Sequence, residues 1–320
     1  MMNYYEPLTY IVTSSEEGWL LRTVLRQKLG ISRKLLSRLK LTEEGITVNG
    51  VRQYTNVTVK QGDVVRVSMA QERSTDILPQ KLPLRILFED DHLLIVDKPA
   101  GMIVHPTHGH YTDTLANAVV YHWRETGKQH RFRPVHRLDQ ETSGVLAVAK
   151  NPYAQQMIAL QMQAGDVVKE YIAFVYGRPP AASGTVEGPI DRDPLEPHIR
   201  VVTPTGYPAV THYRLEESFG AASRMRLRLE TGRTHQIRVH MQHIGCPLIG
   251  DKLYRRLDGE AEQPSFEEFI SRQALHASRL SFDHPVSGQR LDFIAELPED
   301  MALLMNRLRM FASDNHRIKE

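Results

Sequence analysis

The stretch from residue 133 to residue 149 constrains this chain most, because a loop dense in charge leads directly into an apolar segment. Residues 133–144 read Arg-Pro-Val-His-Arg-Leu-Asp-Gln-Glu-Thr-Ser-Gly, and residues 145–149 are continuously apolar. A short apolar run bounded by turn residues is typical of a buried strand. Asp139 is therefore expected on a loop presented by a rigid strand, where functional side chains often lie. The alternative is that Asp139 only caps a turn and pairs with Arg137.

The composition indicates a globular protein with one large domain and one small one. The chain has 320 residues, of which 41% are hydrophobic, an ordinary value for such proteins. Its only cysteine is Cys246, which excludes an intrachain disulfide and a cysteine-based zinc site. The N-terminus lacks the pattern of a signal or transit peptide, and no apolar run approaches the length of a membrane-spanning helix. We therefore expect a cytoplasmic protein that does not bind a membrane.

Positive charge is concentrated at the front of the chain. Residues 1–70 carry ten Lys/Arg and six Asp/Glu, a balance of +4, whereas the remainder carries 30 and 32, a balance of −2. Apolar residues recur at helical spacing between residues 19 and 41, with Gly30 placed to end one helix and Ser32 to cap the next. The cations between these apolar positions form one predicted basic face: Arg22, Arg26, Arg33, Lys34 and Arg38.

Short alternating strands are expected after these helices, at residues 46–51, 57–59 and 64–67, with Asn-Gly and Gly-Asp turns between them. A small helix-helix-strand unit with basic helices is suited to binding structured RNA through its phosphates. The alternative is an ordinary solvated helical surface. Residues 17–69 resemble the alpha-L RNA-binding module first described in a ribosomal protein. We therefore expect an RNA-binding module at 1–70, a polar linker at 71–83 and a second domain at 84–320.

The second domain is predicted to mix strands and helices. Residues 84–88 and 93–96 are strand-like and flank a hairpin turn, and Asp113 begins a predicted helix that runs to about Arg124. Asn151-Pro152 is a typical start for a helix that ends at Gly165. Prolines and hairpin turns between residues 179 and 213 argue against a simple doubly wound sheet. The predicted fold class is α+β.

Two more motifs carry polar groups toward one side of a predicted element. Strand alternation places Lys169 and Tyr171 on the same face. In residues 230–241, Thr234 is placed to cap a helix on which His235 and Arg238 share a face. An arginine inside an otherwise apolar helix needs an anionic partner.

Asp139 is a candidate for that partner, and the cation would keep the carboxylate ionised. An ionised, oriented Asp can act as a nucleophile or a base. The alternatives are that Tyr171 is a packed aromatic residue and that Arg238 makes a structural ion pair.

Other chemistries have weaker support. The loop with His105, His108 and His110 could be read as a metal site, but there is no His-Glu-x-x-His helix, and most loop histidines are solvated polar groups. The sequence also lacks the Gly-x-Gly-x-x-Gly, P-loop and Gly-x-Ser-x-Gly motifs. We therefore expect no metal and no nucleotide cofactor.

Taken together, the motifs of residues 84–298 resemble the RNA pseudouridine synthases of the RluA type. The motifs appear in order: 89–102 (Glu-Asp-Asp-His-Leu-Leu-Ile-Val-Asp-Lys-Pro-Ala-Gly-Met), 104–106, 113–115, 136–144, Lys169-x-Tyr171, 232–240 (Gly-Arg-Thr-His-Gln-Ile-Arg-Val-His), 247–251 and 276–285. The resemblance implies a mixed, mainly antiparallel sheet flanked by helices and loops.

The resemblance also implies a reaction in which uridine in RNA becomes its carbon-linked isomer, with no cofactor. Asp139 would be the nucleophile at either C1′ of the sugar or C6 of the base, Tyr171 would stack on the uracil, and Arg238 would pair with Asp139. Arg137 is the candidate for filling the gap left by the flipped base. The other substrate contacts are expected at His136, Lys169, Arg233 and His235.

The front module favours ribosomal RNA of the large subunit as the substrate, with transfer RNA as the rival. We expect a monomer, because no long heptad run is visible. The alternative function is a catalytically silent RNA-binding assembly factor or chaperone on the same fold.

Overall fold

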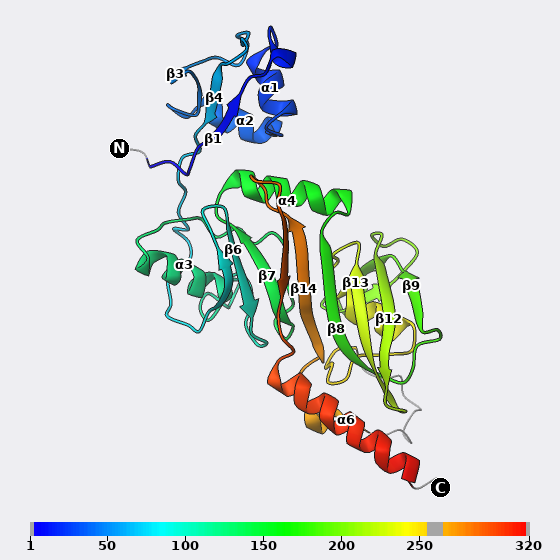
Figure 1. Ribbon diagram of the computed structural model, residues 1–320. Coiled ribbons are helices and arrows are strands. Elements are labelled where there is room, and N and C mark those ends of the chain that lie inside the picture. The colour runs from blue at the N-terminus through cyan, green and yellow to red at the C-terminus, as the bar shows by residue number, and fades with distance from the viewer. Residues whose placement is uncertain (1–2, 255–264, 318–320) are drawn as a thin grey trace.

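The computed structural model describes residues 3–254 and 265–317, in which a small N-terminal module stands at one end of a large sheet (Figure 1). The module, residues 3–70, has a four-stranded sheet in the order β1-β4-β2-β3 and two helices that cover it. Its elements are β1 (Leu8–Ile11), a 3-10 turn (Ser14–Glu16), α1 (Leu21–Gln27), α2 (Arg33–Lys40), β2 (Ile46–Val48), β3 (Val51–Arg52) and β4 (Val64–Val67).

The local sequence explains the helices of the module better than its strands. Ser32 caps α2, because its Oγ accepts the Leu35 N–H at 3.2 Å, and Gly30 turns the chain after α1 with a φ of +63°. The prediction of a strand at 57–59 was wrong, since only Thr58 there makes an isolated bridge. Strand β1 was not predicted at all; its pairing partner β4 lies more than fifty residues further along the chain, beyond the reach of local patterns.

The main region, residues 84–317, is built on a large sheet in the order β5-β6-β7-β14-β8-β13-β12-β9, with β15 paired to β14. The β7–β14 pairing is parallel and the other ladders along this path are antiparallel. This confirms the predicted mixed, mainly antiparallel sheet. Its strands are β5 (Arg85–Glu89), β6 (Leu93–Lys98), β7 (Ser143–Ala149), β8 (Val168–Tyr176), β9 (Ser183–Glu187), β12 (Val210–Ser218), β13 (Ala222–Leu229), β14 (Leu275–Asp283) and β15 (Arg290–Ile294).

Helices and short strands surround this sheet. In Figure 1, α4 crosses the end of the sheet beneath the module, α3 lies beside β6, and α6 runs across the opposite end. Buried side chains fill both faces of the sheet. The remaining elements are α3 (Leu115–Glu125), α4 (Pro152–Ala164), β10 (Ile190–Arg192), β11 (Arg200–Val202), α5 (Gln236–His243), a 3-10 turn (Glu267–Phe269) and α6 (Glu299–Arg317).

Helix starts were predicted with mixed success. Asn151 caps α4 and Gly165 ends it in the left-handed conformation, as expected. The cap of α3, however, is Thr114 rather than Asp113, because the Thr114 and Asn117 side chains form a reciprocal capping box. The cap position of α5 is His235 rather than Thr234, and the His235 side chain makes no capping bond.

The predicted linker, residues 71–83, packs against the main region. Ile77 is buried in the same core as Trp123 and Phe132. Gln80 exchanges two hydrogen bonds with Asp113, at 2.6 and 2.8 Å. The segment is therefore ordered by side-chain contacts. Across residues 3–254 and 265–317, no helix is both long and apolar enough to span a membrane.

Candidate active site

The loop that carries Asp139 is laid along β7 before it turns into that strand. The Val135 N–H donates to the Ala147 carbonyl at 3.0 Å, and the Ala149 N–H donates to the Arg133 carbonyl at 2.8 Å. The Asp139 carbonyl then accepts the Thr142 N–H at 3.1 Å and closes the turn. All of β7 is buried. The sequence therefore produces the expected arrangement, a polar loop fixed on a rigid buried strand.

Gly144 allows the turn to enter the sheet. Its φ is +117°, and a Cβ on this residue would lie 2.2 Å from the Ala277 carbonyl oxygen on β14. Both observations require glycine, because other residues pay a steric cost at positive φ and no side chain fits this gap. The Thr-Ser-Gly end of the motif thus reflects the close approach of β7 and β14.

Asp139 lies beside the buried cation Arg238. Arg238 Nη1 is 3.3 Å from Asp139 Oδ2, while Arg238 Nε and Nη2 bind Asp251 at 2.7 and 2.8 Å. The contact between Arg238 and Asp139 was predicted, but the two-point pairing with Asp251 was not. The Arg238 and Asp251 side chains are 5% and 0% exposed, whereas Asp139 is 28% exposed. Arg238 is therefore held rigidly by one carboxylate and presents a free edge to the other.

The pKa directions fit this arrangement. Burial acts to lower the pKa of Arg238, but the hydrogen bonds and charges of Asp251 and Asp139 outweigh burial and raise it. Burial acts to raise the pKa of Asp251, and Arg238 outweighs it, so that this pKa is lowered. Both groups are consequently ionised at neutral pH.

Tyr254 and His235 complete the support around Arg238. The guanidinium lies 4.8 Å from the centroid of the Tyr254 ring, close enough for a cation–π contact. The Tyr254 hydroxyl accepts the Arg200 N–H and lies 2.8 Å from His235 Nδ1. His235 has a φ of +58° and holds the cap position of α5 in the left-handed region. Burial lowers the pKa of His235 although the Asp139 charge opposes that shift.

Tyr171 lies on β8 in the same core cluster as Leu138, the residue before Asp139. It is 6% exposed. Burial raises the pKa of its hydroxyl above the usual range for tyrosine, and the Asp139 charge adds to this effect. Tyr171 therefore keeps its proton at neutral pH. Lys169 precedes it on the same face of β8, half-buried, with its pKa lowered by burial.

The residues flanking Asp139 differ in exposure. Arg137 is exposed. His136 instead points back to β7, where its Nε2 accepts the Ala147 N–H at 3.4 Å. Burial, followed by the charge of Lys169, lowers the pKa of His136 to about 4. Arg233 lies at the rim, where its Nε donates to the Pro208 carbonyl at 3.0 Å.

Lys98 was not assigned a role from the sequence, yet it supports the Asp139 loop. Its fully buried Nζ donates to the carbonyls of Pro99, Met102 and Gln140, at 2.9, 2.9 and 3.1 Å. Burial lowers the pKa of Lys98 to about 7, and the Asp139 charge partly opposes that shift. The Gly101 N–H adds a bond to the Gln140 carbonyl at 2.9 Å. The residue after Asp139 is thus clamped by the turn at 98–101.

The signals for Lys98 and Asp251 were present in the sequence. Both residues lie in motifs that carried the family resemblance, at 89–102 and 247–251. A charged residue inside an apolar motif needs a buried partner, and this rule could have marked both. Tyr254 lies three residues after the 247–251 motif, and nothing in its local sequence indicated that it contacts Arg238.

The cations predicted for the module lie on its helices and are all exposed: Arg22, Arg26, Arg33, Lys34 and Arg38. Arg38 differs from the others because it contacts the Glu72 carboxylate. The apolar side chains of the same helices, including Leu35, Leu36 and Leu39, are buried in the module core. The helices therefore have the predicted division into an apolar and a basic face.

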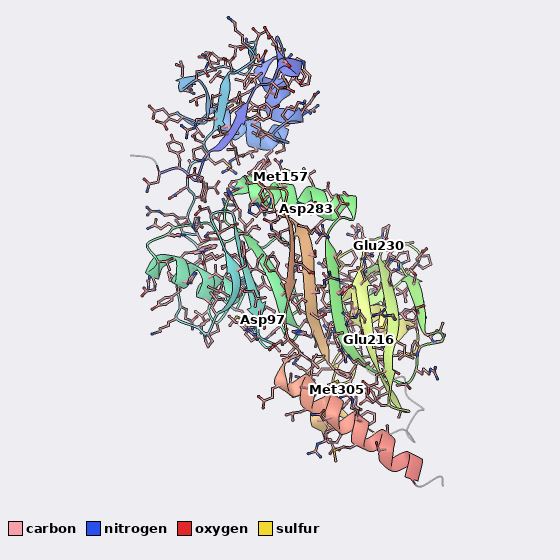
Figure 2. The ribbon with its side chains drawn as sticks, viewed as in Figure 1. Asp97, Met157, Glu216, Glu230, Asp283 and Met305 are labelled. Carbon is pink, nitrogen blue, oxygen red and sulfur yellow. The ribbon has the colours of Figure 1, made fainter. Side chains whose placement is uncertain are left out.

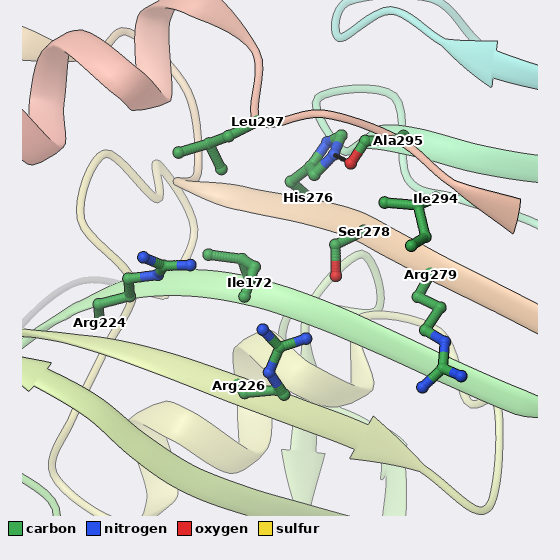
Figure 3. Close-up of a pocket in the computed structure, with 9 residues that line it drawn as sticks. All are labelled: Ile172, Arg224, Arg226, His276, Ser278, Arg279, Ile294, Ala295 and Leu297. Atoms are coloured by element: carbon green, nitrogen blue, oxygen red, sulfur yellow. Dashed lines mark hydrogen bonds between the residues drawn. The ribbon is translucent and has the colours of Figure 1, made fainter.

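Two cavities in the main region lie away from Asp139. One of about 250 Å³, shown in Figure 3, is lined by Ile172, which points to the face of β8 opposite Tyr171. Its arginines are matched by carboxylates: Arg226 binds Glu216 and Glu170, and Arg279 binds Asp292. The other, of about 550 Å³, includes Lys98 and the 296–300 segment but not Asp139. Asp139 lines neither of these two cavities.

The histidine loop does not assemble a metal site. His105 packs against Phe132, with ring centroids 5.8 Å apart, and His108 lies 3.4 Å from the Tyr111 hydroxyl. Across residues 3–254 and 265–317 there is no group of three or more His, Cys, Asp or Glu side chains placed to hold a metal ion.

The fold is similar to that of a solved RNA pseudouridylate synthase domain protein. The human RNA pseudouridylate synthase domain containing 4 protein superposes with a TM-score of 0.56 and 25% identity, over 70% of this chain and 93% of that chain. The sequence pattern of the RNA pseudouridylate synthase family matches residues 92–243.

Relatives of similar length extend this match over most of the chain. Ribosomal large subunit pseudouridine synthase D of Xanthomonas campestris is 44% identical over 257 residues, which cover 79% of this chain and 77% of the relative. An uncharacterised RNA pseudouridine synthase of Bacillus subtilis is 42% identical, over 82% and 86%. The chain belongs to the RNA pseudouridylate synthase family. It is an isomerase that converts uridine in RNA to pseudouridine.

Proposed function

We propose that this protein isomerises specific uridines in large-subunit ribosomal RNA, with Asp139 as the nucleophile. The observation that carries this proposal is the contact of a partly exposed Asp139 carboxylate with the buried, doubly anchored Arg238. A nearby cation favours the ionised form of the Asp139 carboxylate. Asp251 anchors Arg238 and so fixes the direction from which the guanidinium contacts Asp139. An ionised carboxylate is the form of Asp that can attack carbon.

The reaction breaks the bond between N1 of uracil and C1′ of ribose, turns the base, and forms a bond from C5 to C1′. The proton on C5 is lost, and N1 gains one. Asp139 forms a covalent intermediate at either C1′ or C6, and its carboxylate is released when the new bond is complete. No atom of the product comes from a cofactor.

The target base must leave its stack to reach Asp139, at a cost of a few kcal/mol. We propose that Arg137, which is exposed and lies two residues before Asp139, fills the gap in the RNA. Tyr171 supplies an aromatic ring on which uracil can stack. Its raised pKa makes the hydroxyl a neutral donor rather than an anionic base. His136 hydrogen-bonds to β7, so we propose that it supports the loop and does not contact the substrate. The proposed substrate contacts are Lys169, Arg233 and His235.

The choice of ribosomal RNA rests on two observations. Several relatives at about 40% identity are named ribosomal large subunit pseudouridine synthase D, and the module offers an exposed basic face suited to RNA phosphates. We further propose that residues 1–70 act as the RNA-binding module, residues 84–320 as the catalytic domain, and that the protein is a cytoplasmic monomer.

Release of tritium tests the chemistry. Purified protein should release tritium from RNA labelled at C5 of uridine, and Asp139→Asn should reduce this rate at least about 1000-fold, as expected when a nucleophile is removed. RNA binding should stay within about twofold, because the amide keeps the shape of the side chain. Equal turnover by the two proteins would rule out Asp139 as the nucleophile. Absence of turnover in the wild type would favour a catalytically silent binding protein.

A second experiment addresses the substrate. Pseudouridines should be mapped in total RNA from cells with and without the gene. We expect specific positions in large-subunit ribosomal RNA to lose the modification. Loss confined to transfer RNA would contradict the proposed substrate while leaving the proposed chemistry intact.

A further inference from the structure

Glu72 joins the module to the segment that leads into the Asp139 loop. Its carboxylate contacts Arg38 on α2, Arg133 at 2.5 Å and Arg131 at 3.7 Å. Arg38 belongs to the module, whereas Arg131 and Arg133 belong to the main region. Arg133 is 6% exposed and Glu72 is 20% exposed. One half-buried carboxylate therefore holds cations from both parts of the chain.

Gln156 on α4 makes a second connection between the same two parts. Its Oε1 accepts the Ser32 N–H at 2.9 Å, and its Nε2 donates to the Gly30 carbonyl at 2.6 Å. Tyr153 and Met157, also on α4, pack against the core of the module. Figure 2 shows Met157 on the side of α4 nearest the module. The start of α2 is thus fixed to a helix of the main region.

A third connection lies next to Glu72. The Glu72 N–H donates to the Tyr5 hydroxyl at 3.2 Å, and the Tyr5 ring stacks on His130 with centroids 5.6 Å apart and planes 10° apart. The Phe132 N–H donates to the Ser74 hydroxyl at 2.8 Å. The backbone of Glu72, through Tyr5, and the side chain of Ser74 are therefore also connected to residues 130–132.

The position of Arg133 makes this connection relevant to the reaction. Its carbonyl is bonded to β7 at the start of the loop, and Asp139 follows six residues later. Six residues of extended chain span at most about 20 Å. The Glu72 junction is therefore separated from the proposed nucleophile by one short, fixed stretch of loop. On its other side the junction contacts Arg38, in the second half of α2.

We propose that Glu72 is a positioning residue that sets the RNA-binding face of the module at a fixed place relative to Asp139, and so determines which uridine reaches the site. This inference rests on the proposed function. A module fixed in this way accepts only RNA whose module-binding element and target uridine have the matching separation. Arg38 then acts through Glu72 and not by binding RNA itself.

A double-mutant cycle tests the inference, using steady-state tritium release from labelled large-subunit ribosomal RNA by the full-length protein. Glu72→Gln, Arg38→Gln and the double variant should each raise KM by about 5–10-fold, with kcat within about twofold. The increase in the double variant should be no larger than in the single variants, because residues in contact have non-additive effects. The Arg38→Gln variant leaves the Glu72–Arg133 pair intact. It therefore tests the contact with the module in a protein that keeps the more buried ion pair. The matched control is Glu217→Gln, which breaks the pairing of Glu217 with Arg309 on α6 and should leave KM unchanged.

A distance measurement gives a readout that does not depend on activity. Spin labels at Ser37→Cys on α2 and Glu125→Cys on α3, both exposed positions, should give one narrow distance distribution in the wild-type background. The distribution should be wider with Glu72→Gln, although the contacts of α4 still hold the start of α2. The native Cys246 will not compete for label, because it is buried and burial raises its pKa to about 11.

The outcomes separate this inference from the proposed function. If the KM increases of the two single variants multiply in the double variant, Arg38 binds RNA independently of Glu72. That result would overturn the role of Glu72. A narrow distribution together with wild-type KM in Glu72→Gln would overturn it as well. If the wild type releases no tritium, the proposed function fails, and the distance distributions still decide whether Glu72 holds the module in place.

Discussion

The basic face of the module and the Asp139 site both depend on arginine and lysine, but they hold their charges in opposite ways. On the module, Arg22, Arg26, Arg33 and Lys34 extend from helices into solvent. At the site, Arg238 is 5% exposed and is bound at two points by Asp251, which is fully buried. The first arrangement suits many weak contacts with phosphates, and the second suits one carboxylate held in one direction.

The difference predicts how each region responds to mutation. Exposed charges in water contribute little individually, because solvent and salt screen them. A buried pair has lost its water, so removal of one member leaves the other without compensation. Changes at the site should therefore have large effects on stability, and changes on the module should have small, additive effects on RNA affinity.

The largest effect is expected for Asp251→Asn. The variant leaves buried Arg238 without its main anion, and breaking such a pair costs about 3–5 kcal/mol of unfolding free energy. Chemical denaturation at pH 7 measures this loss, and tritium release should fall because Arg238 no longer holds its direction. The matched control is Asp292→Asn, which breaks the partly exposed pairing with Arg279 and should cost at most about 1 kcal/mol. Equal losses would contradict the distinction between buried and exposed charge pairs.

At low pH the difference in unfolding free energy between wild type and Asp251→Asn should become smaller. Because the folded protein lowers the pKa of Asp251, its stabilisation is complete above the unfolded value of about 3.9. It is lost as the pH falls through the lower, folded value. The gap in unfolding free energy should thus persist from pH 7 to about pH 5 and shrink in stronger acid. A gap that shrinks already between pH 7 and pH 6 would contradict the assignment to Asp251.

An intermediate effect is expected for His130→Phe, where the module meets the main region. Both ring nitrogens of His130 are buried without a hydrogen-bond partner, and burial, before any nearby charge, lowers its pKa to about 4. As the pH falls below about 6.5, the unfolded chain gains a proton that the folded protein does not take up. Stability is therefore lost between about pH 6.5 and pH 4.

Phenylalanine keeps the stacking on Tyr5 and removes this loss. Relative to wild type, His130→Phe should gain about 2 kcal/mol more at pH 5 than at pH 8, as a shift of this size implies. Thermal or urea unfolding at the two pH values measures the difference. A gain that is the same at both values would mean that His130 does not titrate in this range.

The smallest effect is expected for Lys34→Gln on α2. Removal of one phosphate contact should weaken RNA binding by about two- to fivefold and reduce the slope of log affinity against log salt by about 1. Filter binding at several salt concentrations measures both values. Arg66→Gln is the matched control, because Arg66 alternates with buried Val65 and Val67 on β4 and so faces away from the helices. An equal slope change in the control would indicate an effect of net charge alone.

Much of this fold follows from short stretches of sequence. The buried strand after Asp139, the two helices of the module, and helix α4 were predictable because their apolar spacing and caps lie within a few residues of one another. The Asp139–Arg238 contact was predicted for a different reason: an arginine inside an apolar helix requires an anion, and the family resemblance implied that Asp139 is that anion, although the two-point partner is Asp251. Its role in catalysis stays a prediction until the variants are measured.

The remainder depends on contacts between distant residues. Strand β1 pairs with β4 across the whole module, and Asp251 reaches Arg238 from beyond the end of α5. Residues 71–83 looked like a linker because they are polar and rich in proline, yet Ile77 and Gln80 anchor them to the main region. In each case the partner, and not the local sequence, determines the structure.

The absence of room at Gly144 has an evolutionary consequence. A shift of β7 by one residue against β14 would place a side chain against the Ala277 carbonyl, where Gly144 now leaves no space for even a Cβ. This close contact therefore fixes the register between β7 and β14, and an insertion or deletion at this position would disrupt the pairing. We therefore expect related chains to differ more at the rim loops and the module than at the contact between Gly144 and Ala277.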